Sequence, residues 1–70
     1  MVSYKKYEAL LRENGLKTAD VARKTGISQS TFSDWKRGKT VPKADKLYQI
    51  AKELNVHVED LMEVSANEQS

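Results

Sequence analysis

The sequence contains no cysteine and only one histidine among its 70 residues. A disulfide is therefore excluded, and so is a structural zinc site, because such a site normally takes four Cys or His ligands. The absence of cysteine also fits a reducing compartment. Because small domains often need a disulfide, a metal or a partner subunit for stability, this chain must depend on efficient packing or on oligomerisation.

Long apolar runs are missing as well. No stretch approaches the roughly 20 residues that a membrane-spanning helix needs. The opening residues, MVSYKKYEAL, lack the apolar centre of a signal peptide. We therefore expect a cytoplasmic protein without a membrane partner. One domain is expected over residues 1–64, followed by a polar tail or linker at 65–70, although this tail could instead lead into a second domain.

The residues that enzymes use are also scarce. One His, no Cys, no cluster of metal ligands and no glycine-rich phosphate loop leave no catalytic group that the chain could assemble. The segment GISQS lacks the second glycine of the nucleophile motif G-x-S-x-G. The sequence therefore predicts a binding protein rather than an enzyme, with no cofactor and no metal.

Charged residues are present in both signs but are unevenly distributed. Residues 1–42 contain nine Lys or Arg against four Asp or Glu, a balance of +5, whereas residues 43–70 contain three against six, a balance of −3. This polarity indicates an anionic partner on the basic side of the molecule. Chance scatter of solvated charge is the alternative interpretation.

Apolar residues recur at helical spacing, and no segment shows the sustained alternation of a strand, so we expect an all-α fold. Ser3 and Ser28 are good N-cap residues, and glycine follows each of the first three helical patterns. The cap of the second helix is ambiguous between Thr18, which has the better capping chemistry, and Lys17. Five helices are predicted, at 3–14, 18–24, 28–37, 43–54 and 58–62.

The third of these helices has an unusual exposed face. Phe32 and Trp35 lie on one side at i,i+3 spacing and are expected to be buried. Short side chains on the other side let another body approach closely, and Gln and Arg can make bidentate contacts to base edges. This outward face carries Gln29, Ser30, Ser33, Asp34 and Arg37.

The segment LKTADVARKTGISQSTFSDWKRGKTVPKADKLYQIAKELNVHVEDL resembles the Cro and phage-repressor type of helix-turn-helix domain, the XRE family. The resemblance extends over about residues 10–61. It rests on marks that occur in register, among them Val21-Ala22, Gly26-Ile27-Ser28, Phe32, Trp35 and Gly38. It implies a compact five-helix bundle of the lambda-repressor-like DNA-binding type, with the helix-turn-helix motif at about 17–37.

The resemblance also implies roles for individual residues. The third helix would enter the major groove of double-stranded DNA, with base edges read by Gln29, Ser30, Ser33 and Asp34. Phosphates would be bound before the second helix and after the third, by Lys17, Thr18, Arg37, Lys39 and Thr40. The chain departs from the family at Thr18, where Gln is frequent, and at His57, where Ser or Thr usually caps the last helix. Asp34 either accepts from a cytosine amino group or repels the DNA backbone and sharpens specificity.

A sequence-specific transcriptional regulator, of the phage or prophage repressor type, is the function that these features predict. Such proteins typically bind as dimers to half-sites about 34 Å apart. Met62 and Val64 are apolar positions without an obvious core role, so the C-terminal helix is the expected homodimer surface. The alternative is a protein-interaction module on the same fold, such as an antitoxin component.

Overall fold

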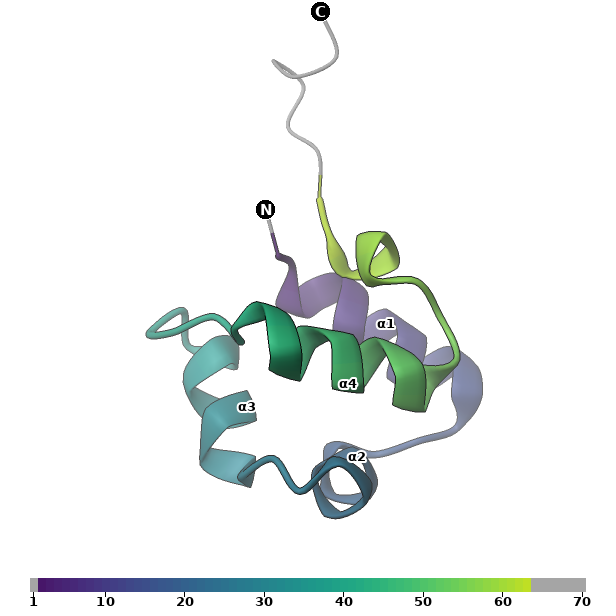
Figure 1. Cartoon of the computed structure of the whole chain (residues 1–70), viewed down its shortest axis with the longest axis horizontal. Coiled ribbons are helices and arrows are strands. Elements are labelled where there is room, and N and C mark those ends of the chain that lie inside the picture. The colour runs from purple at the N-terminus through teal and green to yellow at the C-terminus, as the bar shows by residue number, and fades with distance from the viewer. Residues whose placement is uncertain (1, 64–70) are drawn as a thin grey trace, which may run out of the picture.

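The computed structural model describes residues 2–63, which form four α-helices and one 3-10 turn (Figure 1). The expected all-α architecture is confirmed. Within this range the only extended pairing is an isolated antiparallel bridge between Val2 and Met62. Val64 and the tail expected at 65–70 lie outside the described residues. The elements are α1 (Tyr4–Asn14), α2 (Thr18–Thr25), α3 (Gln29–Lys36), α4 (Ala44–Leu54) and η1 (Val58–Leu61).

The prediction of a fifth α-helix at 58–62 is wrong. The element η1 is a single 3-10 turn, and Met62 after it has an extended backbone with φ −103° and ψ 150°. Met62 cannot continue the helix because it forms the bridge to Val2, while the backbone N–H of Ser3 donates to the carbonyl of Leu61 at 2.8 Å. The chain therefore turns once and then runs back along the N-terminal segment, and a 3-10 turn is the form that such short pieces take.

The ends of α1 follow the predicted capping residues. The Ser3 hydroxyl accepts the backbone N–H of Lys6 at 3.3 Å. At the other end Gly15 has φ 63°, and the N–H of Leu16 donates to the carbonyl of Leu11 at 2.9 Å. This pattern is a Schellman stop, which satisfies carbonyls that the helix itself leaves unpaired.

The helix α2 begins after Lys17, which settles the ambiguity in favour of Lys17 as the N-cap residue. The backbone of Lys17 is extended and its side chain makes no capping hydrogen bond. Thr18 is the first helical residue, and its hydroxyl lies 3.0 Å from the phenol oxygen of Tyr7 on α1. The Thr18 hydroxyl therefore does not cap the first turn of α2, because its side chain is turned toward α1.

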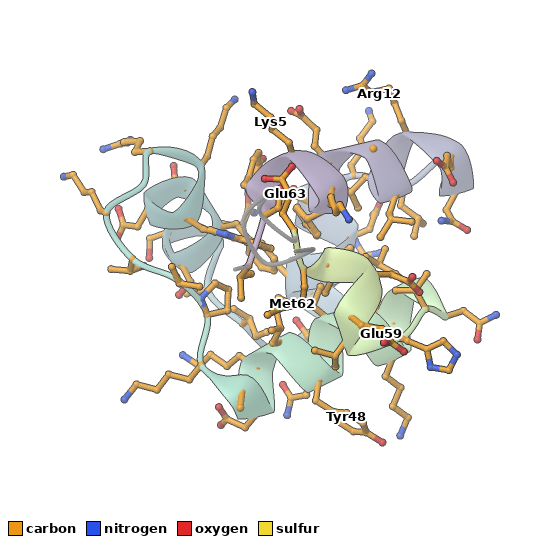
Figure 2. All side chains as sticks on the ribbon, turned by 90° about the horizontal axis from the view of Figure 1, so that it is seen from above. Lys5, Arg12, Tyr48, Glu59, Met62 and Glu63 are labelled. Carbon is orange, nitrogen blue, oxygen red and sulfur yellow. The ribbon has the colours of Figure 1, made fainter. Side chains whose placement is uncertain are left out.

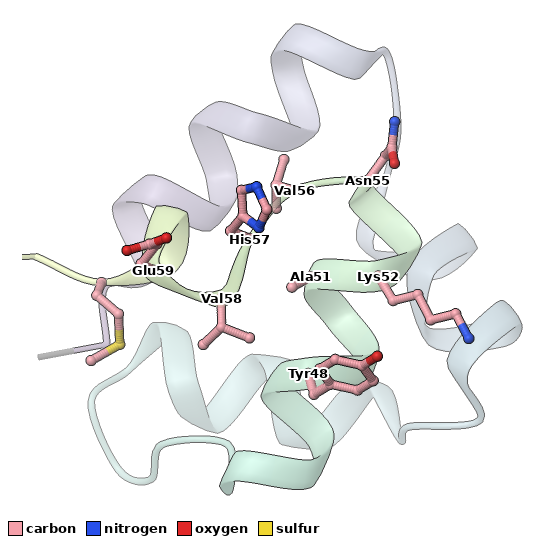
Figure 3. A pocket seen from close by; sticks show the side chains of 9 residues that line it. Tyr48, Ala51, Lys52, Asn55, Val56, His57, Val58 and Glu59 are labelled. Carbon is pink, nitrogen blue, oxygen red and sulfur yellow. The ribbon is translucent and has the colours of Figure 1, made fainter.

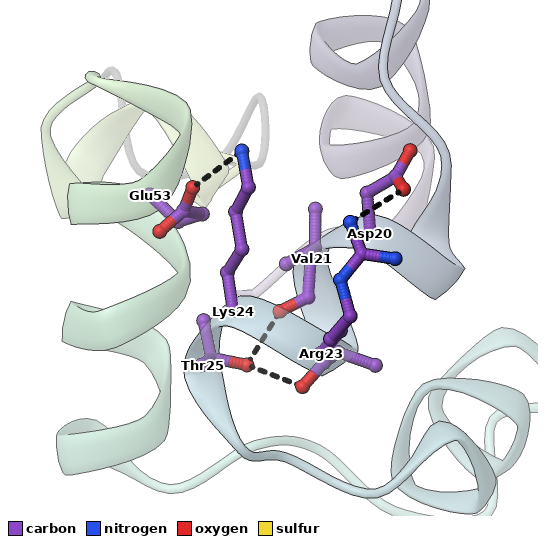
Figure 4. A network of polar contacts seen from close by, with 7 residues as sticks. Asp20, Val21, Arg23, Lys24, Thr25 and Glu53 are labelled. Atoms are coloured by element: carbon purple, nitrogen blue, oxygen red, sulfur yellow. Dashed lines mark hydrogen bonds and ion pairs between the residues drawn. The ribbon is translucent and has the colours of Figure 1, made fainter.

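The turn from α2 to α3 is held by the side chain of Thr25. Its hydroxyl donates to the carbonyl of Val21 at 2.7 Å (Figure 4). The same oxygen accepts the N–H of Ile27 at 3.3 Å. Gly26 between them has φ 78°, a left-handed conformation that strains residues with a Cβ. Buried Ile27 then directs the chain into α3.

Both ends of α3 are also fixed locally. The Ser28 hydroxyl accepts the N–H of Ser30 at 3.1 Å, which confirms Ser28 as the N-cap. At the C-terminal end Gly38 has φ 79°, and the N–H of Lys39 donates to the carbonyl of Asp34 at 2.8 Å. The helix ends at Lys36, one residue earlier than predicted, since Arg37 already has a near-zero ψ of −6°.

One hydrophobic core joins all five elements. Figure 1 shows α4 running across the middle of the domain. The helix α4 buries Leu47, Ile50, Ala51 and Leu54, which recur at helical spacing. Ala44, the first residue of α4, is exposed. Near the other end of α4, Glu53 forms an ion pair with Lys24 of α2 at 3.6 Å (Figure 4), a partly exposed contact of the kind that contributes about 0–1 kcal/mol.

Aromatic rings attach α3 to α1. Tyr7 is fully buried, and its ring stacks on Phe32 at 5.4 Å between centroids and lies 5.1 Å from Trp35. Tyr4 meets the edge of Trp35 at 5.3 Å and 87°. Such pairs add about 0.5–1.5 kcal/mol beyond the area that they bury. The buried side of α3 is therefore held firmly, and its other side is free to face outward.

Candidate nucleic-acid interface

The exposed face of α3 carries the side chains that the sequence predicted there. Gln29, Ser30 and Ser33 are exposed and Asp34 is half-buried, while Phe32 and Trp35 on the opposite side are in the core. Within residues 2–63 the side chains of Gln29 and Ser33 have no hydrogen-bond partner in the protein. Both therefore retain their full capacity to donate to and accept from a ligand.

Ser30 differs from its neighbours because its hydroxyl is engaged. Its oxygen lies 2.6 Å from the hydroxyl of the N-cap residue Ser28, and either atom can be the donor. The same Ser28 oxygen already accepts the backbone N–H of Ser30. The first turn of α3 thus presents two linked hydroxyl groups at the surface.

Asp34 brings one negative charge to this face. Its carboxylate takes part in no ion pair within residues 2–63, and its backbone carbonyl receives the N–H of Lys39. An unpaired carboxylate is an acceptor only. On a surface that faces bases, it matches the exocyclic amino group of cytosine or adenine and disfavours acceptor atoms.

Exposed cationic side chains border α3 and the start of α2. Lys17, Arg37, Lys39 and Thr40 are exposed, and Thr18 is half-buried. The three ion pairs that the structure shows within residues 2–63 involve other residues, at Glu8–Arg12, Asp20–Arg23 and Lys24–Glu53. No carboxylate within residues 2–63 therefore forms an ion pair with Lys17, Arg37 or Lys39, so their positive charges are uncompensated.

The loop after α3 is positioned by its own backbone. The Schellman stop at Gly38 turns the chain away from the helix axis, and Pro42 is buried, so both ends of the loop are fixed. Between them Lys39, Thr40 and Val41 are at the surface, with 56% of Val41 exposed. Figure 1 shows this loop beside the C-terminal end of α3, at one edge of the molecule.

The start of α2 lacks a side-chain cap because Lys17 has no acceptor to offer. The first backbone N–H groups of a helix have no partner within the helix and favour an anion. The positive end of α2 and the Lys17 ammonium therefore reinforce each other. The first turn of α2 also carries Asp20, and the phosphate-binding role expected for Lys17 and Thr18 stays a prediction.

Sequence patterns did not identify the partner of Thr18. The contact to Tyr7 joins residues eleven positions apart on two helices, and the periodicity of a single helix does not reveal such a contact. Burial raises the pKa of Tyr7 to about 12, although the hydrogen bond to Thr18 acts in the opposite direction. The phenol therefore keeps its proton at physiological pH.

A shallow groove of about 690 Å³ lies between α4 and η1 (Figure 3). Ala51 forms part of its floor, and Val58 and Tyr48, which is 61% exposed, supply apolar surface. None of its lining residues belongs to α2 or α3. Figure 2 shows Tyr48 directed outward from α4 and Met62 next to η1. The groove is thus separate from the face of α3 that was described above.

Met62 corrects one sequence-based expectation. The sequence predicts no core role for Met62, yet it is half-buried and packs against the core, where it also borders the groove. The bridge to Val2 fixes its backbone. Only part of Met62 is therefore left for contact with another molecule.

Residues 2–63 show neither a cluster of metal-binding side chains nor a membrane-spanning helix. No group of three or more His, Cys, Asp or Glu in this part of the chain could hold a metal ion. No helix among these residues is long and apolar enough to cross a membrane. His57 is exposed, and its backbone N–H donates to the Asp60 carboxylate at 3.0 Å, which ties together the turn that it begins.

Comparison with known proteins gives one result. Residues 8–67 match a family model described as a Cro/C1-type HTH DNA-binding domain. No curated protein and no solved structure shows a significant match to the chain.

Proposed function

Because the chain belongs to the family of Cro/C1-type HTH DNA-binding domains, we propose that it is a sequence-specific transcriptional regulator of the phage or prophage repressor type. In this proposal α3 lies in the major groove of double-stranded DNA. The observation that carries it is the division of α3 into a face pinned by Phe32 and Trp35 and a face of short, polar, exposed side chains. A helix in the major groove needs both a rigid support and a slim outer surface. In this proposal the protein acts in the cytoplasm.

Sequence readout is assigned to the exposed face of α3. Gln29 at the N-terminal end has a free carboxamide, which can make a bidentate contact to adenine. Ser30 and Ser33 contribute hydroxyl groups close to the helix axis, and Asp34 accepts from a cytosine amino group. The carboxylate acts mainly by excluding bases that present acceptors, because such pairs bring like partial charges together.

Affinity is assigned to the residues around α3 and before α2. The uncompensated charges of Lys17, Arg37 and Lys39 replace counterions at the DNA backbone, and the hydroxyls of Thr18 and Thr40 donate to phosphate oxygens. Such contacts fix the register of the protein on the duplex without reading sequence.

The groove between α4 and η1 is the proposed homodimer surface. Tyr48 and Val58 offer apolar area there, and the groove leaves α3 accessible. A two-fold dimer would place two copies of α3 on half-sites about 34 Å apart. Polar residues at the rim, such as Lys52 and Glu59, are suited to the edge of an interface between two copies.

The dependence of DNA binding on salt tests the proposed function. Fluorescence anisotropy with a mixed pool of duplexes is expected to show affinity that falls linearly on a log–log plot against salt. Lys39→Ala should lower the magnitude of this slope by about 1. The matched control is Lys46→Ala, since Lys46 is an exposed lysine on α4 and outside the proposed interface. Salt-independent, weak binding would instead favour a protein-interaction module, such as an antitoxin component.

A further inference from the structure

Tyr7 contacts both parts of the proposed DNA interface although it is itself completely buried. Its ring stacks on Phe32 and lies against Trp35, the two residues that support α3. Its hydroxyl lies 3.0 Å from the hydroxyl of Thr18 at the start of α2. One side chain of α1 therefore sets the position of the reading helix relative to a proposed phosphate contact.

The direction of the Tyr7–Thr18 hydrogen bond follows from burial. Thr18 is the one hydrogen-bond partner of the phenol within residues 2–63, and Tyr7 has 0% of its surface exposed to water. If Thr18 donated to Tyr7, the phenol proton would be buried without an acceptor, which is costly. Tyr7 therefore donates and the Thr18 oxygen accepts.

This direction determines what the Thr18 hydroxyl can offer to a ligand. Its own proton is not used by Tyr7, and Thr18 is half-buried, so one side of the residue faces solvent. A hydroxyl that already accepts one hydrogen bond is polarised toward donation. Phosphate oxygens are acceptors only, so a hydroxyl fixed as a donor fits them.

We propose that Tyr7 is a positioning residue for DNA binding, which holds the Thr18 hydroxyl as a donor to a backbone phosphate and couples that contact to the placement of α3. The proposal rests on the proposed function as a DNA-binding protein. It assigns a role to the phenol hydroxyl that burial alone does not require, because phenylalanine would fill the same space.

A double-mutant cycle on DNA affinity tests this role. The variants are Tyr7→Phe, Thr18→Val and the double variant, with Thr18→Ser as the conservative variant that keeps the donor. Tyr4→Phe is the matched control, because Tyr4 packs beside Tyr7 while its hydroxyl has no hydrogen bond within residues 2–63. Dissociation constants are measured on a mixed duplex pool, at a temperature where melting curves show every variant to be folded.

Loss of the phosphate donor in Thr18→Val should weaken binding about tenfold, whereas Thr18→Ser should keep the wild-type affinity. Tyr7→Phe should weaken binding about threefold, because the donor is then oriented only part of the time. The double variant should bind no more weakly than Thr18→Val alone, and Tyr4→Phe should match the wild type.

Three results would overturn the proposal. Wild-type affinity in Tyr7→Phe, or in Thr18→Val, would show that the hydroxyl pair has no part in binding. Independent effects that multiply in the double variant would show that Tyr7 does not act through Thr18. Failure of the wild-type protein to bind any duplex would instead refute the proposed function itself, and the positioning role with it.

Discussion

At the scale of single residues, the exposed side of α3 is poor helix-forming sequence. Ser33 and Asp34 disfavour a helix relative to the Lys, Glu or Ala that an exposed face usually carries. The buried rings of Phe32 and Trp35 compensate for this loss by anchoring the helix to α1 and the core. The choice of residues is therefore explained by contact with a ligand better than by stability.

Gln29→Ala is expected to relax sequence specificity at one base position. The carboxamide lost is the group assigned to adenine, so the preferred duplex should lose about 1–3 kcal/mol of binding free energy relative to a duplex altered at that position. Competition titrations with the two duplexes measure this difference. Lys39→Ala is the control, since a phosphate contact weakens both duplexes alike. Equal losses for the two duplexes in Gln29→Ala would contradict the reading role of α3.

Tyr7 makes stability depend on pH in the alkaline range. Its folded-state pKa of about 12 lies above the value of 10.0 expected in the unfolded chain. The unfolded state therefore releases this proton at lower pH than the folded state does. The contribution of Tyr7 to the free energy of unfolding is fully present below pH 10 and is lost as the pH rises toward 12.

The contribution of Tyr7 can be isolated by comparison with Tyr7→Phe. Urea unfolding of both proteins should show wild type ahead by about 1 kcal/mol at pH about 9, because its hydroxyl makes one hydrogen bond. This advantage should shrink at up to about 1.4 kcal/mol per pH unit above pH 10. All other residues are the same in the two proteins, so the comparison isolates the Tyr7 hydroxyl. A constant difference across this range would show that the Tyr7 phenol does not resist ionisation.

At the scale of the elements, α3 has eight residues and is too short to be stable alone. Its N-cap, its glycine stop and its aromatic anchors together hold it in place. Ser28→Ala removes the cap and should lower the free energy of unfolding by about 1 kcal/mol. Ser33→Ala is the matched control, because Ser33 is an exposed mid-helix serine whose replacement raises helix propensity and should leave stability equal or higher. Thermal unfolding measures both changes, and similar losses in the two variants would argue against Ser28 as the cap.

Much of the element structure could be predicted from the sequence because capping is local. Ser3, Ser28, Gly15 and Gly38 each occupy the position that the sequence indicated. These signals depend on contacts within a few residues, so no knowledge of the fold is needed to interpret them.

The errors in the element predictions depend on contacts distant in sequence. The fifth α-helix fails because Met62 pairs with Val2 at the other end of the domain. Thr18 has better capping chemistry than Lys17, yet its hydroxyl is bound to Tyr7 instead. Neither interaction leaves a periodic trace in the sequence.

In the candidate site, too, features that depend on local sequence could be predicted, and features that depend on distant contacts could not. The exposure of Gln29, Ser30 and Ser33 followed from their place on the helix opposite Phe32 and Trp35. The link through Tyr7 did not, because it needs the relative placement of three helices. Residue roles at the DNA remain predictions that the variants above address.

At the scale of the whole molecule, the two halves of the sequence differ in charge and contribute to different proposed surfaces, the exposed face of α3 and the groove between α4 and η1. The basic balance of residues 1–42 includes the uncompensated cations beside α2 and α3. Residues 43–70 are acidic on balance and contribute α4 and η1, which line the groove proposed for dimerisation.

Tyr48→Glu is expected to shift the protein from dimer to monomer. A carboxylate at this exposed position would be desolvated against the second copy without a partner, which is costly at an interface. Sedimentation velocity over a range of concentrations measures the change. Gln49→Glu is the control, because Gln49 is an exposed neighbour on α4 that does not line the groove. Identical sedimentation of wild type and Tyr48→Glu would place the dimer contact elsewhere or exclude it.

The most direct test of sequence-specific DNA binding is selection of bound duplexes from a random pool, followed by sequencing. Sequence-specific binding through α3 predicts enrichment of one motif, and it predicts that Gln29→Ala loses the preference at a single position within that motif. A two-fold symmetric motif with half-sites about one helical turn apart would also report the dimer. Recovery of a pool that stays random after repeated selection, with wild-type protein that is folded, would contradict the account.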